Sequence, residues 1–198
     1  MSSAFHFSEL LSSLLEAKLQ PGPLVPEGWK PLTELKISYG GKDVRLGNYL
    51  KTRETSEKPV VEFTLAGDEG DTYTLMLLDP DAPTPEDPKF AFWRHWVLAG
   101  LQSAPSPAKE TKPALTAYLG PGAKDHVATP HRYIFLLFKE PAAFAKVENK
   151  DVGGEEFVDR RSFKADAFVE EHGLVLVGAN WFMGVGDEFV EPIKLEIE

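Results

Sequence analysis

The sequence lacks several features that would each have indicated a particular class of protein. None of its 198 residues is a cysteine, which excludes disulfide bonds, thiol catalysis and the cysteine ligands of zinc sites. No apolar run approaches the roughly 18 residues of a membrane-spanning helix. The N-terminus shows neither the basic stretch nor the apolar core of a secretory signal peptide. We therefore expect a cytoplasmic protein without an integral membrane segment.

Positive charge is also scarce. Lysine and arginine number 21 against 31 aspartate and glutamate residues, which leaves a formal net charge of −10, and no basic cluster interrupts this balance. Such a surface repels nucleic acids and anionic membranes, so we expect neither as a partner. A small anionic ligand would meet the same repulsion. Any site for one must therefore supply its own local hydrogen-bond donors.

Hydrophobic residues make up 42% of the chain, enough for a core, and 16 Gly and 16 Pro are scattered among them. This composition predicts short elements joined by turns within one domain. Residues 1–24 are expected to form an amphipathic helix and a linker, because apolar residues recur there at helical spacing until Pro21-Gly22-Pro23. We expect this helix to pack on a single domain of residues 25–198, although a partner-binding role for it is the alternative.

From Thr33 onward the apolar spacing changes to two, which is typical of strands. Strands are expected near residues 35–46, 60–65, 73–78, 92–98, 114–119, 132–138 and 174–177. The continuous apolar run Tyr73 to Leu78 predicts a central strand covered on both faces. A helix is expected near residues 163–168 and should end at Gly173. The fold class is therefore mainly β, an antiparallel β-sandwich with an N-terminal helix and a few short peripheral helices.

Two pairs of short motifs carry the candidate chemistry. Asp79-Pro80-Asp81-Ala82-Pro83 is followed by Trp93-Arg94-His95-Trp96, and Gly120-Pro121 is followed by Pro130-His131-Arg132-Tyr133. Each motif lies where an apolar run meets a loop rich in proline and glycine. Rigid loops should therefore hold carboxylates and imidazoles at the ends of buried strands, where together they form a polar pocket. The Ala82–Pro83 bond is a candidate for the cis form.

Several chemistries compete for these carboxylates and imidazoles. A divalent metal usually has at least one pair of ligands at short spacing, which is missing here, so we expect no metal and no cofactor. Asp79-x-Asp81 after an apolar strand is typical of haloacid-dehalogenase phosphatases, but Pro83 breaks that motif and the surrounding elements do not alternate as βαβ. No Gly-x-Ser-x-Gly elbow or activated nucleophile is present, so we expect no enzyme.

Two further interpretations of the same residues stay open. One is an enzyme in which Asp79 works with His95 or His131 as an acid–base pair. The other is purely structural, because aspartates beside prolines often cap their own turns and single histidines are usually ordinary interior residues.

In this order the motifs closely resemble the signatures of the phosphatidylethanolamine-binding protein family, also called Raf kinase inhibitor-like proteins. Further similarity runs through Leu46-Gly47-Asn48, Arg161-x-Phe163 and residues 173–180, and covers roughly residues 25–185. Within the family the chain is similar to the fungal branch, which includes the cytosolic inhibitor of the vacuolar serine carboxypeptidase Y.

The resemblance implies a non-enzymatic, regulatory binding protein with one small pocket for a phosphate-containing molecule or a phosphoethanolamine head group. Carried over residue by residue, eight positions would line this pocket: Asp79, Pro83, Trp93, His95, Gly120, Pro121, His131 and Tyr133. The two histidines would donate hydrogen bonds to phosphate oxygens. Asp79 would either pair with the ammonium group of ethanolamine or orient an imidazole.

The fungal resemblance implies an alternative function, inhibition of a serine carboxypeptidase, with Ser2 to Phe7 as the segment that would enter the peptidase cleft. One departure from the family bears on the pocket. Residues 122–129 lack the prolines that relatives have there, which predicts a looser pocket wall and weaker binding. We expect His126, within this stretch, to be solvated rather than to enter the pocket.

Overall fold

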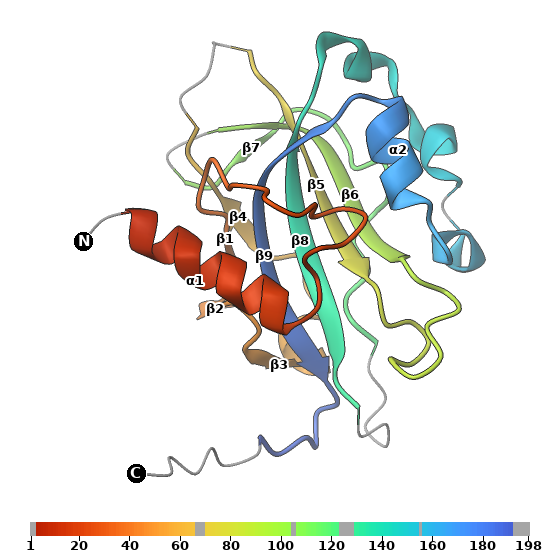
Figure 1. The fold of residues 1–198 in the computed structure, drawn as a ribbon. Coiled ribbons are helices and arrows are strands. Elements are labelled where there is room, and N and C mark those ends of the chain that lie inside the picture. The colour runs from red at the N-terminus through yellow and green to blue at the C-terminus, as the bar shows by residue number, and fades with distance from the viewer. Residues whose placement is uncertain (1–2, 66–69, 104–105, 123–128, 155, 192–198) are drawn as a thin grey trace.

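Two β-sheets form the body of the protein in the computed structural model (Figure 1), which describes residues 3–65, 70–103, 106–122, 129–154 and 156–191. The larger sheet has six strands in the order β3-β9-β8-β5-β6-β7, and the smaller one has three in the order β2-β1-β4. The strands are β1 (Lys36–Tyr39), β2 (Lys42–Asp43), β3 (Tyr49–Lys51), β4 (Val60–Glu62), β5 (Tyr73–Asp79), β6 (Trp93–Gln102), β7 (Lys109–Glu110), β8 (His131–Lys139) and β9 (Val175–Val185).

Within the described ranges, two α-helices and four short 3-10 helices surround the sheets. The α-helices are α1 (Ser3–Glu16) and α2 (Ala165–Glu171), and the 3-10 helices are η1 (Thr52–Glu54), η2 (Ala142–Lys146), η3 (Asn149–Val152) and η4 (Phe157–Arg160). Gly173 follows α2 with φ of +61°, a left-handed conformation that ends the helix as the sequence predicts. In the described part of the chain, no helix combines the length and the apolar character needed to cross a bilayer.

Strand β5 lies at the centre of the molecule. It pairs antiparallel with β6 on one side and β8 on the other, and all seven of its residues are buried. Leu75 and Leu77 point into a core between the two sheets, whereas Met76 and Leu78 point into a second core on the opposite face. The prediction of a central strand covered on both faces is thus confirmed.

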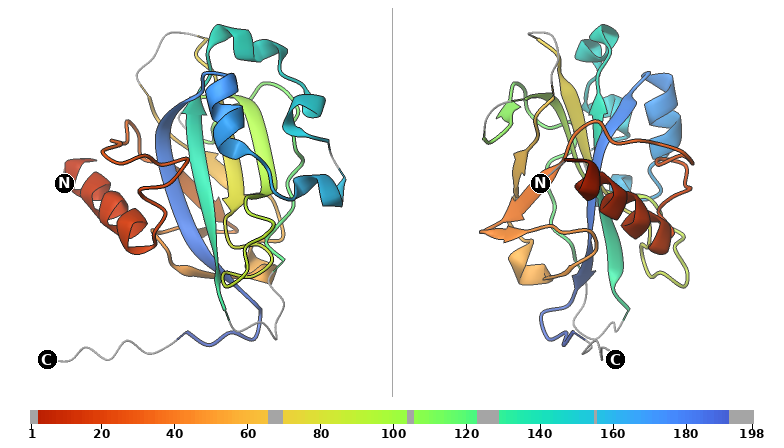
Figure 2. Two further views of the ribbon diagram at one scale, coloured as in Figure 1. Left: turned by 45° about the vertical axis from the view of Figure 1, so that its right-hand side comes forward. Right: turned by 60° about the vertical axis from the view of Figure 1, so that its left-hand side comes forward.

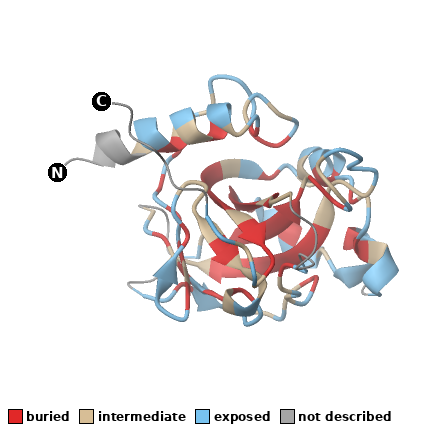
Figure 3. Ribbon diagram, turned by 90° about the horizontal axis from the view of Figure 1, so that it is seen from below, coloured by how far each residue is buried: buried red, intermediate tan, exposed pale blue. Residues whose placement is uncertain are grey.

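The two cores explain how the layers hold together. The first lies between the sheets and takes Ile37 from β1 and Val61 from β4. The second lies between the larger sheet and the helices, and takes Leu14 from α1 and Phe168 from α2. Figure 2 shows the small sheet and α2 on opposite sides of the larger sheet. In Figure 3 the buried residues follow the strands, while α1 is buried along one side only.

The expected fold class is confirmed, with differences in detail. Strand β3 runs parallel to β9, so the larger sheet is mixed rather than purely antiparallel. The segment 114–119, expected as a strand, forms only an isolated bridge between Thr116 and Val97. The late strand is longer than expected, because β9 continues through 178–182 to Val185. The apolar residues of 114–119 alternate because this segment is a loop that packs along the edge of the sheet beside β6.

Asn180, in the middle of β9, links the larger sheet to the chain of the smaller one. Its Nδ2 donates hydrogen bonds to the carbonyl oxygens of Leu35 and Val44, each at 3.0 Å. Its Oδ1 accepts from the backbone N–H of Trp181 at 2.8 Å. Asn180 is itself buried, so these three bonds have no competition from water.

We expect Asn180→Ala to lower the free energy of unfolding by about 3 kcal/mol, because it leaves two buried carbonyl groups without donors. Urea denaturation followed by circular dichroism measures this loss. The control is Glu171→Ala at an exposed position at the end of α2, which should change stability by less than about 0.5 kcal/mol. Equal, small effects of both substitutions would show that Asn180 does not hold the sheets together.

Candidate functional site

The ends of three neighbouring strands meet at one edge of the larger sheet. Strand β5 ends at Asp79, while β6 begins at Trp93 and β8 begins at His131. Both neighbours run antiparallel to β5, so their first residues lie beside its last ones, and Asp79 pairs directly with Trp93. The Ala82–Pro83 bond in the loop after β5 is cis, as expected. Residues that are far apart in sequence are thereby brought together.

A β-bulge at the start of β6 decides which side chains face the site. In the register of β5 with β6, Leu77 pairs with Trp96 and Leu78 pairs with Arg94. His95 is therefore an extra residue without a partner on β5. Such a bulge reverses the alternation of side chains on the bulged strand.

This reversal brings His95 into the site. Trp96 faces the core between the sheets. In a regular strand, Arg94 would face the same core as Trp96, and His95 would face the opposite side. The structure shows the opposite. The ring of His95 lies 5.2 Å from the ring of Tyr133, while the guanidinium of Arg94 lies 5.0 Å from the ring of Phe163 on the other face.

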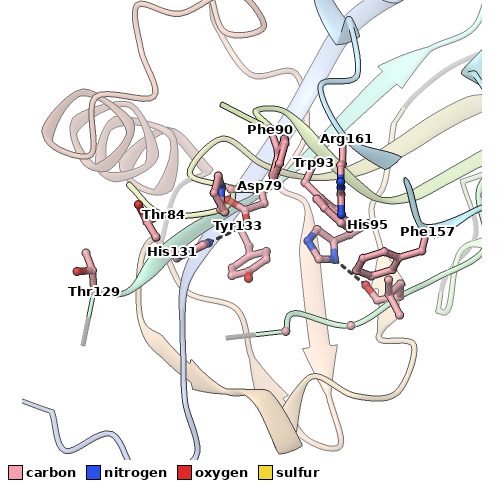
Figure 4. A pocket seen from close by; sticks show the side chains of 15 residues that line it. Asp79, Thr84, Phe90, Trp93, His95, Thr129, His131, Tyr133, Phe157 and Arg161 are labelled. Carbon is pink, nitrogen blue, oxygen red and sulfur yellow. Dashed lines mark hydrogen bonds and ion pairs between the residues drawn. The ribbon is translucent and has the colours of Figure 1, made fainter. Parts of the chain in front are cut away.

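These strand ends and their loops enclose a pocket of about 590 Å³ (Figure 4). Seven of the eight predicted residues line it, and the eighth, Pro121, is buried nearby without lining it. The lining residues are Asp79, Ala82, Pro83, Thr84, Phe90, Trp93, His95, Leu119, Gly120, Gly122, Thr129, His131, Tyr133, Phe157 and Arg161. The structure thus gathers the two sequence motifs into one cavity.

Asp79 and His131 form an ion pair in the wall of this pocket. Nδ1 of His131 lies 2.9 Å from Oδ2 of Asp79, and both residues are buried. Burial alone would lower the pKa of His131, but the hydrogen bond and the charge of Asp79 outweigh this and raise the pKa above its ordinary value. The other oxygen of Asp79 accepts from the backbone N–H of Asp81 at 2.7 Å. Asp79 therefore orients an imidazole, one of the two roles foreseen for it.

His95 differs from His131 in the direction of its pKa shift. Its Nδ1 lies 2.7 Å from the carbonyl oxygen of Leu119, and the backbone N–H of Leu119 donates in return to the carbonyl of His95 at 2.9 Å. Burial lowers the pKa of His95, and the nearby charge of Asp79 does not reverse this. With its proton on Nδ1, the neutral ring presents Nε2 as a hydrogen-bond acceptor.

Asp81, the second carboxylate of the motif, does not line the pocket. It accepts hydrogen bonds from the backbone N–H and from Nε of Arg132, at 2.7 and 2.9 Å. Nη1 of Arg132 donates in turn to the carbonyl oxygen of Ala17 at 2.7 Å. This chain of contacts ties the loop after β5 to β8 and to the segment after α1. Asp81 and Arg132 hold the pocket wall in place from behind.

Tyr133 forms the floor of the pocket beside His95. Its ring stacks on that of Phe182 at 5.1 Å. Gly184 leaves room for it, since a Cβ there would come within 2.2 Å of the Tyr133 ring. Burial, with the charges of Asp79 and Asp81, raises the pKa of Tyr133 well above its ordinary value. The hydroxyl therefore keeps its proton and is a neutral donor at any physiological pH.

The sequence analysis missed an aromatic wall and one cation. Phe90 and Phe157 line the pocket beside Trp93, and Arg161 lies against all three rings. Phe157 and Arg161 come from η4 and the residue after it, far along the chain from the other motifs. The similarity at Arg161-x-Phe163 was a signal at this position, but it carried no information about which cavity Arg161 faces.

Nothing in the described ranges suggests a metal centre, because no group of three or more His, Asp or Glu side chains there is arranged to bind an ion. The expected position of His126 cannot be compared, since residues 123–128 lie outside the described ranges.

The two histidines should titrate on opposite sides of the ordinary value near about 6.5. We expect NMR of the side chains to show His131 above it and His95 below it, and Asp79→Asn to lower the pKa of His131. Asp43→Asn, at an exposed site in β2, is the control and should shift neither. Because folding raises the pKa of His131, its contribution to stability is present at low pH and is lost as pH rises through the folded value. A pKa of His131 that is unchanged in Asp79→Asn contradicts this assignment.

Comparison with known proteins agrees with the fold and the motifs. Residues 40–182 match the family model described as phosphatidylethanolamine-binding protein. The chain is 28% identical to the rice protein MOTHER of FT and TFL1 homolog 2, over 74% of this chain and 77% of that protein. It is 27% identical to the carboxypeptidase Y inhibitor of Saccharomyces cerevisiae, over 78% of this chain and 84% of the inhibitor.

Solved structures show the same fold. A carboxypeptidase Y inhibitor, crystallised in complex with its cognate proteinase, superposes with a TM-score of 0.74 at 23% identity, over 91% of this chain and 96% of the inhibitor. A phosphatidylethanolamine-binding protein from Plasmodium vivax superposes with a TM-score of 0.70 at 24% identity, over 89% and 97% of the two chains. Because the family model spans most of the chain, and the strand ends and loops that it includes build the pocket, this protein belongs to the phosphatidylethanolamine-binding protein family.

Proposed function

We propose that this protein is a non-enzymatic, regulatory binding protein whose pocket takes a phosphate-containing small molecule or a phosphoethanolamine head group. The observation that carries the proposal is the Asp79–His131 pair. Asp79 raises the pKa of His131 and so favours its positively charged form within a pocket wall made largely of apolar residues. In a chain with a net charge of −10, such a local charge is what an anionic ligand requires.

Two donors face the pocket. Nδ1 of His131 is used by Asp79, which leaves the Nε2–H of the same ring for a ligand. The hydroxyl of Tyr133, which also lines the pocket, has a raised pKa and so keeps its own proton. Phosphate oxygens accept hydrogen bonds from both kinds of group.

The position of Asp79 determines where the ammonium group of phosphoethanolamine would bind. The carboxylate of Asp79 is buried, and each of its oxygens already accepts a hydrogen bond from His131 or Asp81. An ammonium group would reach it less readily than the acceptor nitrogen of His95. We therefore assign the phosphate to His131 and place the amine beside His95.

Phosphoethanolamine should bind saturably, and His131→Gln should weaken binding at least about tenfold because it removes the charged donor. Affinity should fall as pH rises through the raised pKa of His131, at pH values above about 6.5, where the phosphate is already largely a dianion. Isothermal titration calorimetry measures both effects. His172→Gln, a matched change at the end of α2, is the control.

The absence of saturable binding, or a flat pH profile above about pH 6.5, contradicts the proposal. The acid–base pair of Asp79 with a histidine is tested in the same samples. Cleavage of the phosphate ester that disappears in His95→Ala would show an enzyme instead of a binding protein.

A second candidate function is inhibition of a serine carboxypeptidase. Its support is the relationship to the yeast carboxypeptidase Y inhibitor over most of both chains. The segment proposed to enter the cleft, Ser2 to Phe7, overlaps the start of α1, and Met1 and Ser2 lie outside the described residues.

If the second candidate is right, the full chain inhibits yeast carboxypeptidase Y stoichiometrically, and deletion of residues 2–6 weakens inhibition by about tenfold or more. Initial rates of peptide hydrolysis at increasing protein concentration measure this. Phosphoethanolamine binding by the shortened chain is the control for folding. Equal inhibition by both chains would exclude the N-terminal segment as the inhibitory element.

A further inference from the structure

Arg161 is a cation in the pocket wall that is held by aromatic rings. The carbon at the centre of its guanidinium lies 4.7 Å from the ring centre of Phe90, 5.8 Å from that of Trp93 and 6.0 Å from that of Phe157. Among the described residues, no carboxylate lies within 4.0 Å of it. Ring faces position a guanidinium without neutralising it, so its N–H groups are free to bind an anion.

Arg161 and His131 lie on opposite sides of the pocket. His131 opens β8 and Trp93, against which Arg161 packs, opens β6, with β5 between the two strands. Strands β8 and β6, which carry His131 and Trp93, are thus two strand spacings apart, roughly 10 Å between their backbones. Figure 4 shows the same arrangement, with Arg161 beside Trp93 and His131 across the cavity. A ligand that binds both groups therefore needs a second anionic group besides its phosphate.

His95 lies between the two cations. Its ring neighbours Tyr133 on the side of His131 and Trp93 on the side of Arg161, at 5.2 and 6.3 Å between ring centres. One ring nitrogen is fixed by the Leu119 carbonyl. The other faces the side of the pocket that holds Tyr133 (Figure 4). The pocket thus presents a positive donor, an acceptor and a second positive donor in that order.

We propose that the pocket selects a phosphoserine group, with its phosphate at His131, its ammonium at His95 and its carboxylate at Arg161. This rests on the proposed function and adds the carboxylate that phosphoethanolamine lacks. The planar fork of a guanidinium matches a carboxylate with two parallel hydrogen bonds. The same group occurs in free phosphoserine and in the head group of a serine phospholipid, and the two sources differ only in whether the phosphate carries a second ester.

The test compares two ligands that differ only in the carboxylate. By isothermal titration calorimetry, O-phospho-L-serine should bind the wild-type chain about tenfold more tightly than phosphoethanolamine. In Arg161→Gln this ratio should fall to about one, and any general effect of the lost charge cancels in the ratio. Arg45→Gln, at an exposed arginine beside Asp43, should keep the tenfold ratio. The D enantiomer should bind more weakly, because three separate contacts distinguish mirror images.

Three outcomes would overturn the proposal. Equal affinity of the two ligands for the wild-type chain would show that the carboxylate is not read, while the proposed head-group function would stand. A tenfold ratio that survives in Arg161→Gln would show that another residue reads the carboxylate. Failure of both ligands to bind would remove the proposed function together with this one. If phosphoserine binds as expected, glycerophospho-L-serine, a diester, distinguishes the two sources of the group. Binding as tight as that of phosphoserine favours the lipid head group, and weaker binding favours the free monoester.

Discussion

The antiparallel pairing of β5 with both β6 and β8 is the constraint on which the site depends. Because each neighbour runs opposite to β5, the end of one strand and the beginnings of the other two must lie at the same edge of the sheet. All of β5 is buried, so it cannot shift by one residue without turning its apolar side chains to the wrong core. The position of Asp79 relative to Trp93 and His131 is therefore as rigid as the core itself.

Buried charge at that edge is tolerated because it is paired. Asp79 bonds to His131, and Asp81 bonds to Arg132 and so to the segment that follows α1. An unpaired carboxylate in these positions would be costly to bury. The same two pairs have different consequences. The Asp81 pair only holds the wall, whereas the Asp79 pair leaves an imidazole with a raised pKa facing the cavity.

Much of this was predictable from sequence patterns. The series of alternating apolar runs indicated a β-sandwich, and the two Pro/Gly-rich motifs indicated one shared pocket, because strand ends and stiff loops are local properties. The resemblance at these motifs supplied the eight residues, of which all but Pro121 line the cavity. The strand prediction that was wrong also rested on a local pattern. The segment 114–119 alternates like a strand, yet it finds only one bridging partner, at Val97.

The sequence by itself determined the family, the strand series and which residue types meet at the strand ends. The tertiary structure alone decided the direction and charge of those residues. A bulge, which depends on the register between two strands, turns His95 into the pocket and Arg94 out of it. Burial and specific partners then raise the pKa of His131 and lower that of His95. Arg161 joins them because folding lays η4 over Trp93, a contact between distant segments that no local pattern encodes.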